Sequence, residues 1–236
     1  MNEPVRHTTR SRSVPAARPT PAASATRVAE SGRTNDPAAT MADILEVATA
    51  EFADKGLAGA RIDEIASLTR TSKRMIYYYF GSKEGLYIAV LEDAYRRMRQ
   101  IEAQLHLEDL APEAALRTLV GFTYDYQTGN PTFIRLVMNE NMHRGEFIAQ
   151  SATIQQLNVP VITAVRQVYE RGVKDGVFRD DVDPIDLHRS ISALCFFSVS
   201  NRHTFSQIFR LDLETPEAIA ARRLSIIEMI VRFVRR

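Results

Sequence analysis

Residues 61–87 read RIDEIASLTRTSKRMIYYYFGSKEGLY, and the spacing of apolar residues in this stretch decides the fold. Ile62 and Ile65 are separated by acidic residues, as on the buried face of a short amphipathic helix. A break at residues 69–71 follows, and a second short segment then runs from Ser72 into a run of aromatic residues. The stretch therefore predicts two helices of about two turns each, joined by a turn of about three or four residues, which is a helix-turn-helix.

The positive charges of this stretch lie on the second predicted helix and at its edges. When such a helix enters the DNA major groove, its N-terminal residues reach base edges and its flanks contact phosphates. We therefore expect Lys73, Arg74 and Met75 to lie at base edges, and Tyr77, Tyr78 and Lys83 to contact phosphates. The full predicted DNA-binding set is Arg61, Arg70, Ser72, Lys73, Arg74, Met75, Tyr77, Tyr78 and Lys83. The alternative for a helix rich in aromatic residues and arginine is a partly buried surface helix.

A wider set of positions has fixed spacings around this stretch: Phe52…Gly56, Ile62-x-x-Ile65-Ala66, Ser72-Lys73, Ile76-Tyr77-x-Tyr79-Phe80 and Ser82-Lys83-x-x-Leu86. Over about residues 41–91, this pattern resembles the DNA-binding domain of TetR-type transcriptional regulators. Arg70 departs from it, because the family usually has at this position a glycine suited to a left-handed turn. Ala60-Arg61 departs too, because it replaces the usual Ser or Thr and so removes an N-cap oxygen worth roughly 1 kcal/mol.

The rest of the chain has the features of an all-α protein. Its apolar residues recur at spacings of three and four, and no segment alternates as a strand does. Asp36-Pro37, Asn130-Pro131, Asp183-Pro184 and Thr215-Pro216 each place a capping side chain before proline, as at a helix start. Besides the helix-turn-helix, we expect helices at about residues 37–55, 82–105, 112–128, 131–144, 151–174, 184–201 and 216–235.

Three parts of different composition divide the chain. Residues 1–36 are rich in Arg, Pro and Ala, and their six arginines against three acidic residues give a charge of +3. Such a segment buries too little apolar surface to offset its ordering entropy, so we predict a disordered arm. The arm either follows the DNA backbone or minor groove, or is a solvated extension without a role. Residues 37–83 are the predicted DNA-binding domain, and residues 84–236 a helical regulatory and dimerisation domain.

Composition and motifs argue against several other classes of protein. The net charge of +1 means that affinity for DNA must come from local clusters of charge. The single cysteine excludes an intramolecular disulfide, and no apolar run approaches the roughly 18 residues of a membrane span, so we expect a cytoplasmic protein. No phosphate-binding loop or nucleophile motif accompanies the five histidines, so we expect no enzyme activity and no cofactor. Glu140 and His143 have the Glu-x-x-His spacing of di-iron bundles but lack the required second pair, so no metal is predicted.

The C-terminal part contains a predicted dimer surface and a predicted ligand site. The last two helices are apolar over more than one face, which is typical of an interface or a central helix, and the TetR resemblance implies a four-helix dimer interface. Between about residues 105 and 174, Arg135, Asn139 and His143 share one helical face and could orient a polar or anionic ligand. The aromatic residues Phe122, Tyr126, Phe133 and Tyr169 could line its cavity. The alternatives are hydrogen bonding at a helix end and ordinary core packing.

These observations predict a dimeric, ligand-responsive regulator that binds double-stranded DNA at a palindromic operator. A single helix-turn-helix reads too few bases for tight specific binding, so two half-sites and a homodimer are expected. The simplest form is a repressor released by a small-molecule effector, with the helix at residues 82–105 linking the two domains. The alternative is a helical small-molecule or protein-binding module with little specific DNA binding.

Overall fold

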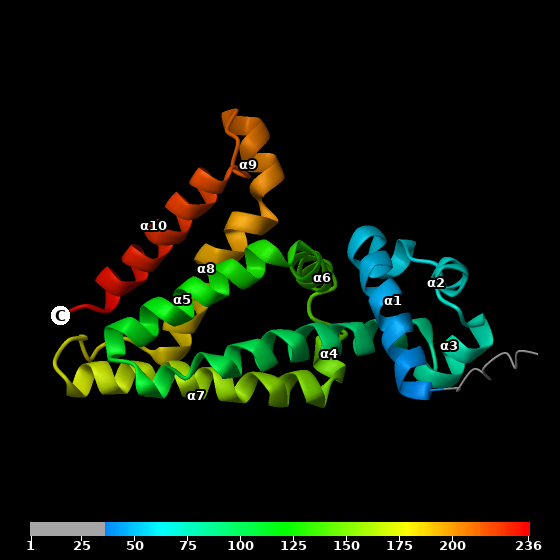
Figure 1. Ribbon diagram of the computed structural model, residues 1–236, viewed down its shortest axis with the longest axis horizontal. Coiled ribbons are helices and arrows are strands. Elements are labelled where there is room, and N and C mark those ends of the chain that lie inside the picture. Colours follow the sequence, from blue (N-terminus) through cyan, green and yellow to red (C-terminus); the bar gives the residue numbers. More distant parts are fainter. Residues whose placement is uncertain (1–35) are drawn as a thin grey trace, which may run out of the picture. The chain divides into compact units, whose positions relative to one another are not determined.

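The computed structural model describes residues 36–236, and these residues are helical throughout, without a β-strand (Figure 1). A single isolated β-bridge pairs Phe178 with Arg235. The α-helices are α1 (Pro37–Gly59), α2 (Ile62–Leu68), α3 (Lys73–Phe80), α4 (Lys83–Glu102), α5 (Pro112–Gly129), α6 (Pro131–Met142), α7 (Ala152–Lys174), α8 (Pro184–Ser200), α9 (Arg202–Phe209) and α10 (Pro216–Val234). Short 3-10 helices are η1 (Ala103–Leu105), η2 (Leu107–Asp109) and η3 (Ile148–Gln150). The predicted all-α fold is confirmed, whereas the predicted arm, apart from Asp36, lies outside the described residues.

Three of the four predicted proline-linked helix starts are capped as expected. Asp36 accepts hydrogen bonds from backbone N–H groups at the start of α1, Asp183 does so for α8, and Thr215 for α10. Asn130 differs, because its side chain does not cap α6 and instead donates from Nδ2 to the carbonyl oxygen of Tyr126 at 2.8 Å. Proline alone therefore marks the start of α6, since its fixed φ suits the first helical turn.

Helix α1 is interrupted at Gly56, and α9 was not predicted from the sequence. Gly56 has φ 66° and ψ 176°, so the regular part of α1 stops where the glycine predicted, and a short turn follows before Ala60. Helix α9 has no side-chain N-cap and buries no residue, and its Ile208 is 71% exposed. Without a cap or a buried face, nothing in the sequence marked α9 as separate from α8.

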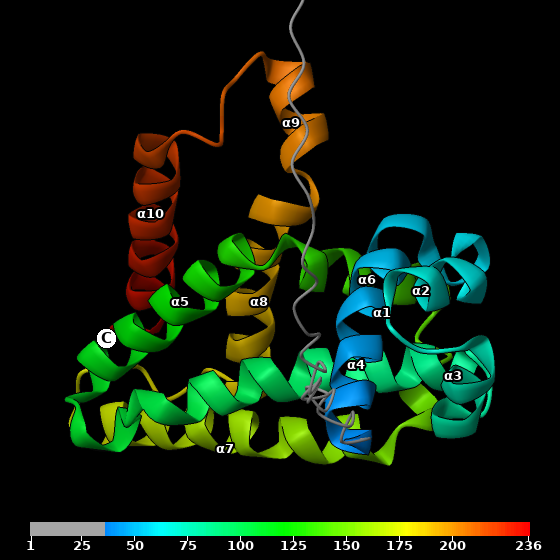
Figure 2. The ribbon, with the colours of Figure 1, turned by 45° about the vertical axis from the view of Figure 1, so that its right-hand side comes forward.

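One hydrophobic core holds the first four helices together. Ile44 and Phe52 of α1, Ile65 of α2, Ile76 of α3 and Leu86 of α4 are fully buried in it. The same core also contains three residues from farther along the chain: Leu136 of α6, Phe147 of the α6–α7 connection and Ile154 of α7. Helix α6 thus packs along α1, as seen in Figure 2.

A second core joins α5, α7, α8 and α10, and a smaller cluster connects it with α4. Leu116 of α5, Val165 of α7, Ile191 of α8 and Ile230 of α10 are buried in the second core. Met98 of α4, Phe133 and Ile134 of α6, and Val199 of α8 make up the smaller cluster. Residues 36–236 form one compact unit, so the predicted domain boundary at residue 83 stays a prediction. None of the helices in the described residues is long and apolar enough to cross a membrane.

Candidate nucleic-acid interface and ligand cavity

Helices α2 and α3 form the predicted helix-turn-helix, and the turn between them is made without a left-handed residue. Thr69 ends α2 in an extended conformation, and its buried hydroxyl donates to the carbonyl oxygen of Ile65 at 3.0 Å. Ser72 caps α3, accepting a hydrogen bond from the backbone N–H of Met75 at 3.3 Å. Arg70 is absent from the positive-φ residues of the described chain, so the side chain at this position does not strain the turn. Arg61 lies at the N-cap of α2 and provides no side-chain cap, as predicted.

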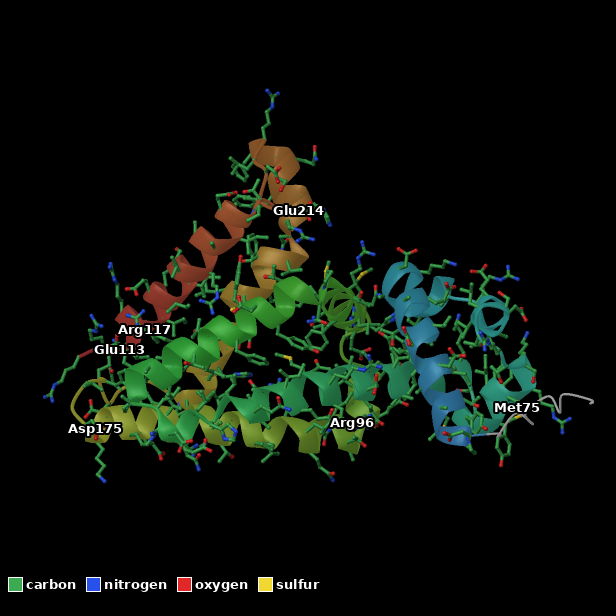
Figure 3. All side chains as sticks on the ribbon, in the orientation of Figure 1. Met75, Arg96, Glu113, Arg117, Asp175 and Glu214 are labelled. Atoms are coloured by element: carbon green, nitrogen blue, oxygen red, sulfur yellow. The ribbon has the colours of Figure 1, made fainter. Side chains whose placement is uncertain are left out.

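Helix α3 turns one face to the core and the other to solvent. Ile76 is fully buried, whereas Lys73, Arg74 and Tyr77 are exposed, and Tyr78 is 76% exposed. Half-buried Met75 adjoins Arg74 at the N-terminal end of this helix, and its position is labelled in Figure 3. The exposed end of α3 therefore presents side chains that can donate hydrogen bonds or make apolar contacts with base edges.

The cations at this surface differ in how strongly neighbouring acidic groups hold them. Lys73 Nζ lies 2.9 Å from an oxygen of Asp63, and the Nε of Arg61 lies 4.0 Å from Glu64. Among residues 36–236, neither Arg70 nor Arg74 has an acidic partner within ion-pair distance. Lys73 must exchange Asp63 for a phosphate or base, whereas Arg74 is available at once.

Lys83 is the other predicted phosphate contact, at the first position of α4. Ser82 caps this helix by accepting from the backbone N–H of Gly85 at 3.0 Å. A lysine at a helix N-terminus opposes the helix dipole, which an incoming phosphate would reverse. Its Nζ makes one long hydrogen bond, of 3.4 Å, to the carbonyl oxygen of Ala58.

Replacing Asp63 with asparagine is expected to strengthen DNA binding. The hydrogen bond from Lys73 lowers the pKa of Asp63, so this carboxylate is charged at neutral pH and competes with phosphate for the lysine. Asp63→Asn removes the competing charge, and the salt slope should steepen by up to about 0.9 for each additional phosphate that the protein neutralises. Fluorescence anisotropy over a salt series measures both quantities. Asp180→Asn, at an acidic residue remote from α3, is the control, and an unchanged slope for Asp63→Asn would contradict a contact by Lys73.

A cavity of about 570 Å³ lies among α4, α5, α6, α7 and α8. Its residues are Tyr95, Met98, Arg99, Glu102, Thr123, Gln127, Phe133, Val137, Asn141, Asn158, His188, Arg189, Ser192, Ala193 and Phe196. This mixture of aromatic walls and a few polar groups, at this volume, is typical of a small-molecule site.

Several polar groups of this cavity are buried, and some lack partners. Arg99 and Glu102 form an ion pair, and both side chains are 12% exposed. Gln127 is 5% exposed, and its Oε1 has no hydrogen-bond partner among the described residues. Burial, followed by the nearby charge of Arg99, lowers the pKa of His188, so its imidazole is neutral at pH 7. The cavity therefore offers an acceptor, a cation and a neutral imidazole to a polar ligand.

The structure separates the predicted ligand residues. Phe133 lines the cavity, and it continues a row of aromatic rings with Tyr126 at 6.0 Å and Phe122 beyond. Arg135 lies 3.4 Å from Asp54 of α1. These residues do not form one site, because Tyr126 lines a separate hollow beside α1 and Arg135 faces α1.

The remaining three predicted ligand residues have protein partners instead. Asn139 Nδ2 donates to the carbonyl oxygen of Phe52 at 3.0 Å, and the ring of His143 packs edge-on against Phe147. The Tyr169 hydroxyl donates to a backbone carbonyl at 2.8 Å and accepts from a backbone N–H at 3.0 Å. These contacts match the alternative of interhelical hydrogen bonding and core packing.

Sequence reasoning missed the polar residues Arg99, Glu102, Gln127 and His188. Arg99 and Glu102 are three residues apart, a spacing typical of solvent-exposed ion pairs on a helix. Their one distinguishing signal was their position on the apolar face of α4, beside Tyr95 and Met98.

One group of possible metal ligands is present in the described chain. Ligand atoms of His106, Glu108 and Asp109 lie within 4.8 Å of one another. All three residues are exposed, and exposed acidic groups of this kind are common without an ion. We therefore assign no metal to them.

Known proteins share both the helix-turn-helix and the regulatory helices. Residues 44–90 match the bacterial regulatory proteins of the tetR family, and residues 112–230 match the tetracyclin repressor-like C-terminal domain. The HTH-type transcriptional repressor NicS of Pseudomonas putida is 38% identical over 210 residues, which cover 89% of this chain and 96% of that protein. The HTH-type transcriptional repressor SCO4008 of Streptomyces coelicolor is 37% identical over 139 residues, covering 58% of this chain and 69% of that protein.

Solved structures share the arrangement of helices. The putative transcriptional regulator SCO4942 from Streptomyces coelicolor superposes with a TM-score of 0.63 at 26% identity, covering 83% of this chain and 98% of that one. A bacterial regulatory protein in the tetR family from Rhodococcus gives 0.65 at 20% identity, covering 83% and 96%, and supports the fold alone. The chain therefore belongs to the TetR family of helix-turn-helix transcriptional regulators, which are DNA-binding proteins and not enzymes.

Proposed function

We propose that this protein is a homodimeric repressor that binds a palindromic operator and leaves it when a small polar or anionic effector occupies the α4–α8 cavity. The observation that carries the DNA-binding part is the exposed N-terminal end of α3, where Arg74 has no acidic partner among the described residues. An arginine in this position can make the bidentate contact with guanine that is the commonest specific contact in the major groove.

The exposed faces of α8 and α10 support the dimer. Ile185 and Phe197 of α8, and Met229 and Phe233 of α10, are exposed, and Leu224 of α10 is 61% exposed. Apolar side chains gathered on adjacent helices mark a protein interface when nothing in the same chain covers them. Two copies joined there would present two α3 helices to successive half-sites.

Leu224→Asp is expected to weaken the dimer and, with it, operator binding. A carboxylate placed in an apolar interface loses its hydration without gaining a partner. Light scattering after gel filtration should show the mass falling toward that of one chain, and operator affinity should fall by roughly tenfold or more, the scale of one disrupted interface contact. Ile208→Asp on α9 adds the same charge at an equally exposed apolar site outside α8 and α10, and should leave the dimer intact. A dimer that survives Leu224→Asp unchanged would contradict this interface.

Effector release follows from the linkage between ligand and conformation. A ligand shifts the protein away from the DNA-binding arrangement only if it binds the other arrangement more tightly. Helix α4 lines the cavity near its C-terminal end and holds Lys83 at its N-terminal end, so a change in its tilt would move the DNA-binding surface.

The test is binding of the purified protein to the DNA upstream of its own gene over a salt series, with random duplex as competitor. A repressor should bind one or two sites specifically and with a steep salt dependence, because counterions are released from each contacted phosphate. Weak binding that is equal on random duplex would contradict the proposal and favour the alternative of a helical small-molecule or protein-binding module.

Lys83→Ala is expected to weaken binding to all duplexes by a similar factor. A phosphate contact carries no sequence information, so loss of the lysine should lower the salt slope by about 0.9 per contact without changing the preferred operator. Lys174→Ala removes an exposed lysine remote from α3 and serves as the control. An unchanged slope for Lys83→Ala would argue against its role as a phosphate contact.

A further inference from the structure

A second cavity, of about 600 Å³, lies on the other flank of α4. Figures 1 and 2 show α4 and α7 running side by side, and Figure 3 labels Arg96 on α4 near α7. The residues of this α4–α7 cavity are Arg96, Arg99, Gln100, Glu102, Ala103, Leu107, Leu119, Thr153, Gln156, Leu157, Pro160, Val161 and Ala164. Residues 153–164 of α7 extend over about 16 Å of helix, so the cavity is long in one direction.

The Arg99–Glu102 ion pair forms the border between the two cavities. Tyr95 and Met98 line the α4–α8 cavity, whereas Arg96 and Gln100 line the α4–α7 cavity. Arg99 and Glu102 line both, because they lie between these two faces of α4.

The guanidinium of Arg99 has a donor to spare at this border. Its Nη1 pairs with Glu102, while its Nε–H is buried and has no hydrogen-bond partner among the described residues. A guanidinium can bind two carboxylates at two different edges, since its five N–H groups point outward in a plane. Buried donors are normally satisfied, so an unpartnered one in a cavity wall indicates where an acceptor belongs.

The remaining wall of the α4–α7 cavity is largely apolar. Leu157, Val161 and Ala164 of α7 lie on one side, and Leu107 and Leu119 continue this surface toward the core. A cation at the border and a long apolar wall beyond it together match an amphiphilic anion with an extended chain.

We propose that the α4–α7 cavity is a second ligand site, for a straight-chain organic acid whose carboxylate accepts a hydrogen bond from Arg99 Nε and whose alkyl chain lies along α7. Because Arg99 and Glu102 border both cavities, occupation of one site changes the binding properties of the other, and this coupling is reciprocal. The effect on operator release rests on the proposed function, whereas the binding itself does not.

A chain-length series tests the site with the full-length protein. Titration calorimetry with hexanoate, octanoate and decanoate should give a Kd that falls by roughly fourfold per methylene, because each added methylene is removed from water. Decanol, which has the chain without the charge, should bind roughly tenfold or more weakly than decanoate. Absence of saturable decanoate binding, or equal affinity for decanol, would overturn the proposal.

Two variants with matched controls locate the ligand. Leu157→Trp fills the α4–α7 cavity and should weaken decanoate roughly tenfold, whereas Val159→Trp places the same side chain on the exposed face of α7 and should have no effect. Arg99→Gln should bring the decanoate and decanol affinities together, while Arg97→Gln, at an exposed arginine of the same helix, should keep them apart. If Leu157→Trp binds decanoate as the unaltered protein does, the ligand lies elsewhere and the proposal fails.

Operator binding is measured separately on the same preparations. Decanoate binding without specific DNA binding would contradict the proposed repressor and leave the second site standing. Specific DNA binding without decanoate binding would refute the second site alone.

Discussion

Arg74→Ala should weaken binding to the specific operator at least about 30-fold while changing binding to random duplex much less. A bidentate arginine–guanine contact contributes about 1–3 kcal/mol of discrimination, and a dimer makes it in both half-sites, so about 2–6 kcal/mol is lost. Arg74 is exposed and has no acidic partner among the described residues, so its replacement leaves no buried group unsatisfied. Competition binding with operator and random duplex gives the ratio directly.

The control for this experiment is Arg166→Ala, which removes an exposed arginine of α7 and thus the same charge far from α3. It should leave the ratio of operator to random-duplex affinity unchanged. If Arg74→Ala instead weakens both duplexes by one common factor, Arg74 contacts phosphate and the assignment to a base edge is wrong.

Glu140→Ala should lower the free energy of unfolding by about 2–4 kcal/mol, because it leaves two backbone donors without an acceptor. Glu140 is 2% exposed, and its Oε1 accepts from the N–H groups of Phe147 at 2.8 Å and Ile148 at 3.0 Å. Burial raises the pKa of the neighbouring Tyr87, and the Glu140 carboxylate adds to the rise, so the tyrosine stays protonated. Urea denaturation followed by circular dichroism measures the loss.

The same substitution should also reduce operator binding, since Glu140 holds Phe147 against the DNA-binding helices. The ring of Phe147 packs edge-on against Tyr87 of α4, which packs in turn against Phe52 of α1. Glu146→Ala removes an exposed carboxylate from the same connection, and its effect on stability should stay within about 0.5 kcal/mol. Equal stability of the two variants would show that the Glu140 hydrogen bonds contribute nothing net.

The helix-turn-helix could be predicted from the sequence because its determinants are local. Apolar spacing within α2 and α3 fixes their buried faces, and Ser72 and Ser82 cap α3 and α4 through hydrogen bonds to residues three positions away. Arg70 was harder to interpret, because a turn can be closed by hydrogen bonds of a neighbouring threonine as well as by a left-handed glycine.

The ligand-binding part could be predicted only as a region. Asn139 has the polar character of a ligand contact, yet its partner is a carbonyl oxygen of α1, 87 residues earlier in the chain. Arg99 and Glu102 look like a surface pair in the sequence, and they are buried only because α5, α7 and α8 pack over α4. Contacts between distant segments decide both cases, and a single sequence does not reveal such contacts.

The shared core around Phe52 has a consequence for protein engineering. Leu136, Phe147 and Ile154 complete the packing of the DNA-reading helices from outside them in the chain. A segment excised at residue 83 and fused to a foreign sensor would leave these three side chains behind, and the voids would cost several kcal/mol. Chimeric biosensors built from this protein should therefore carry α6 and the connection to α7 along with α1–α4, and exchange parts only beyond residue 154.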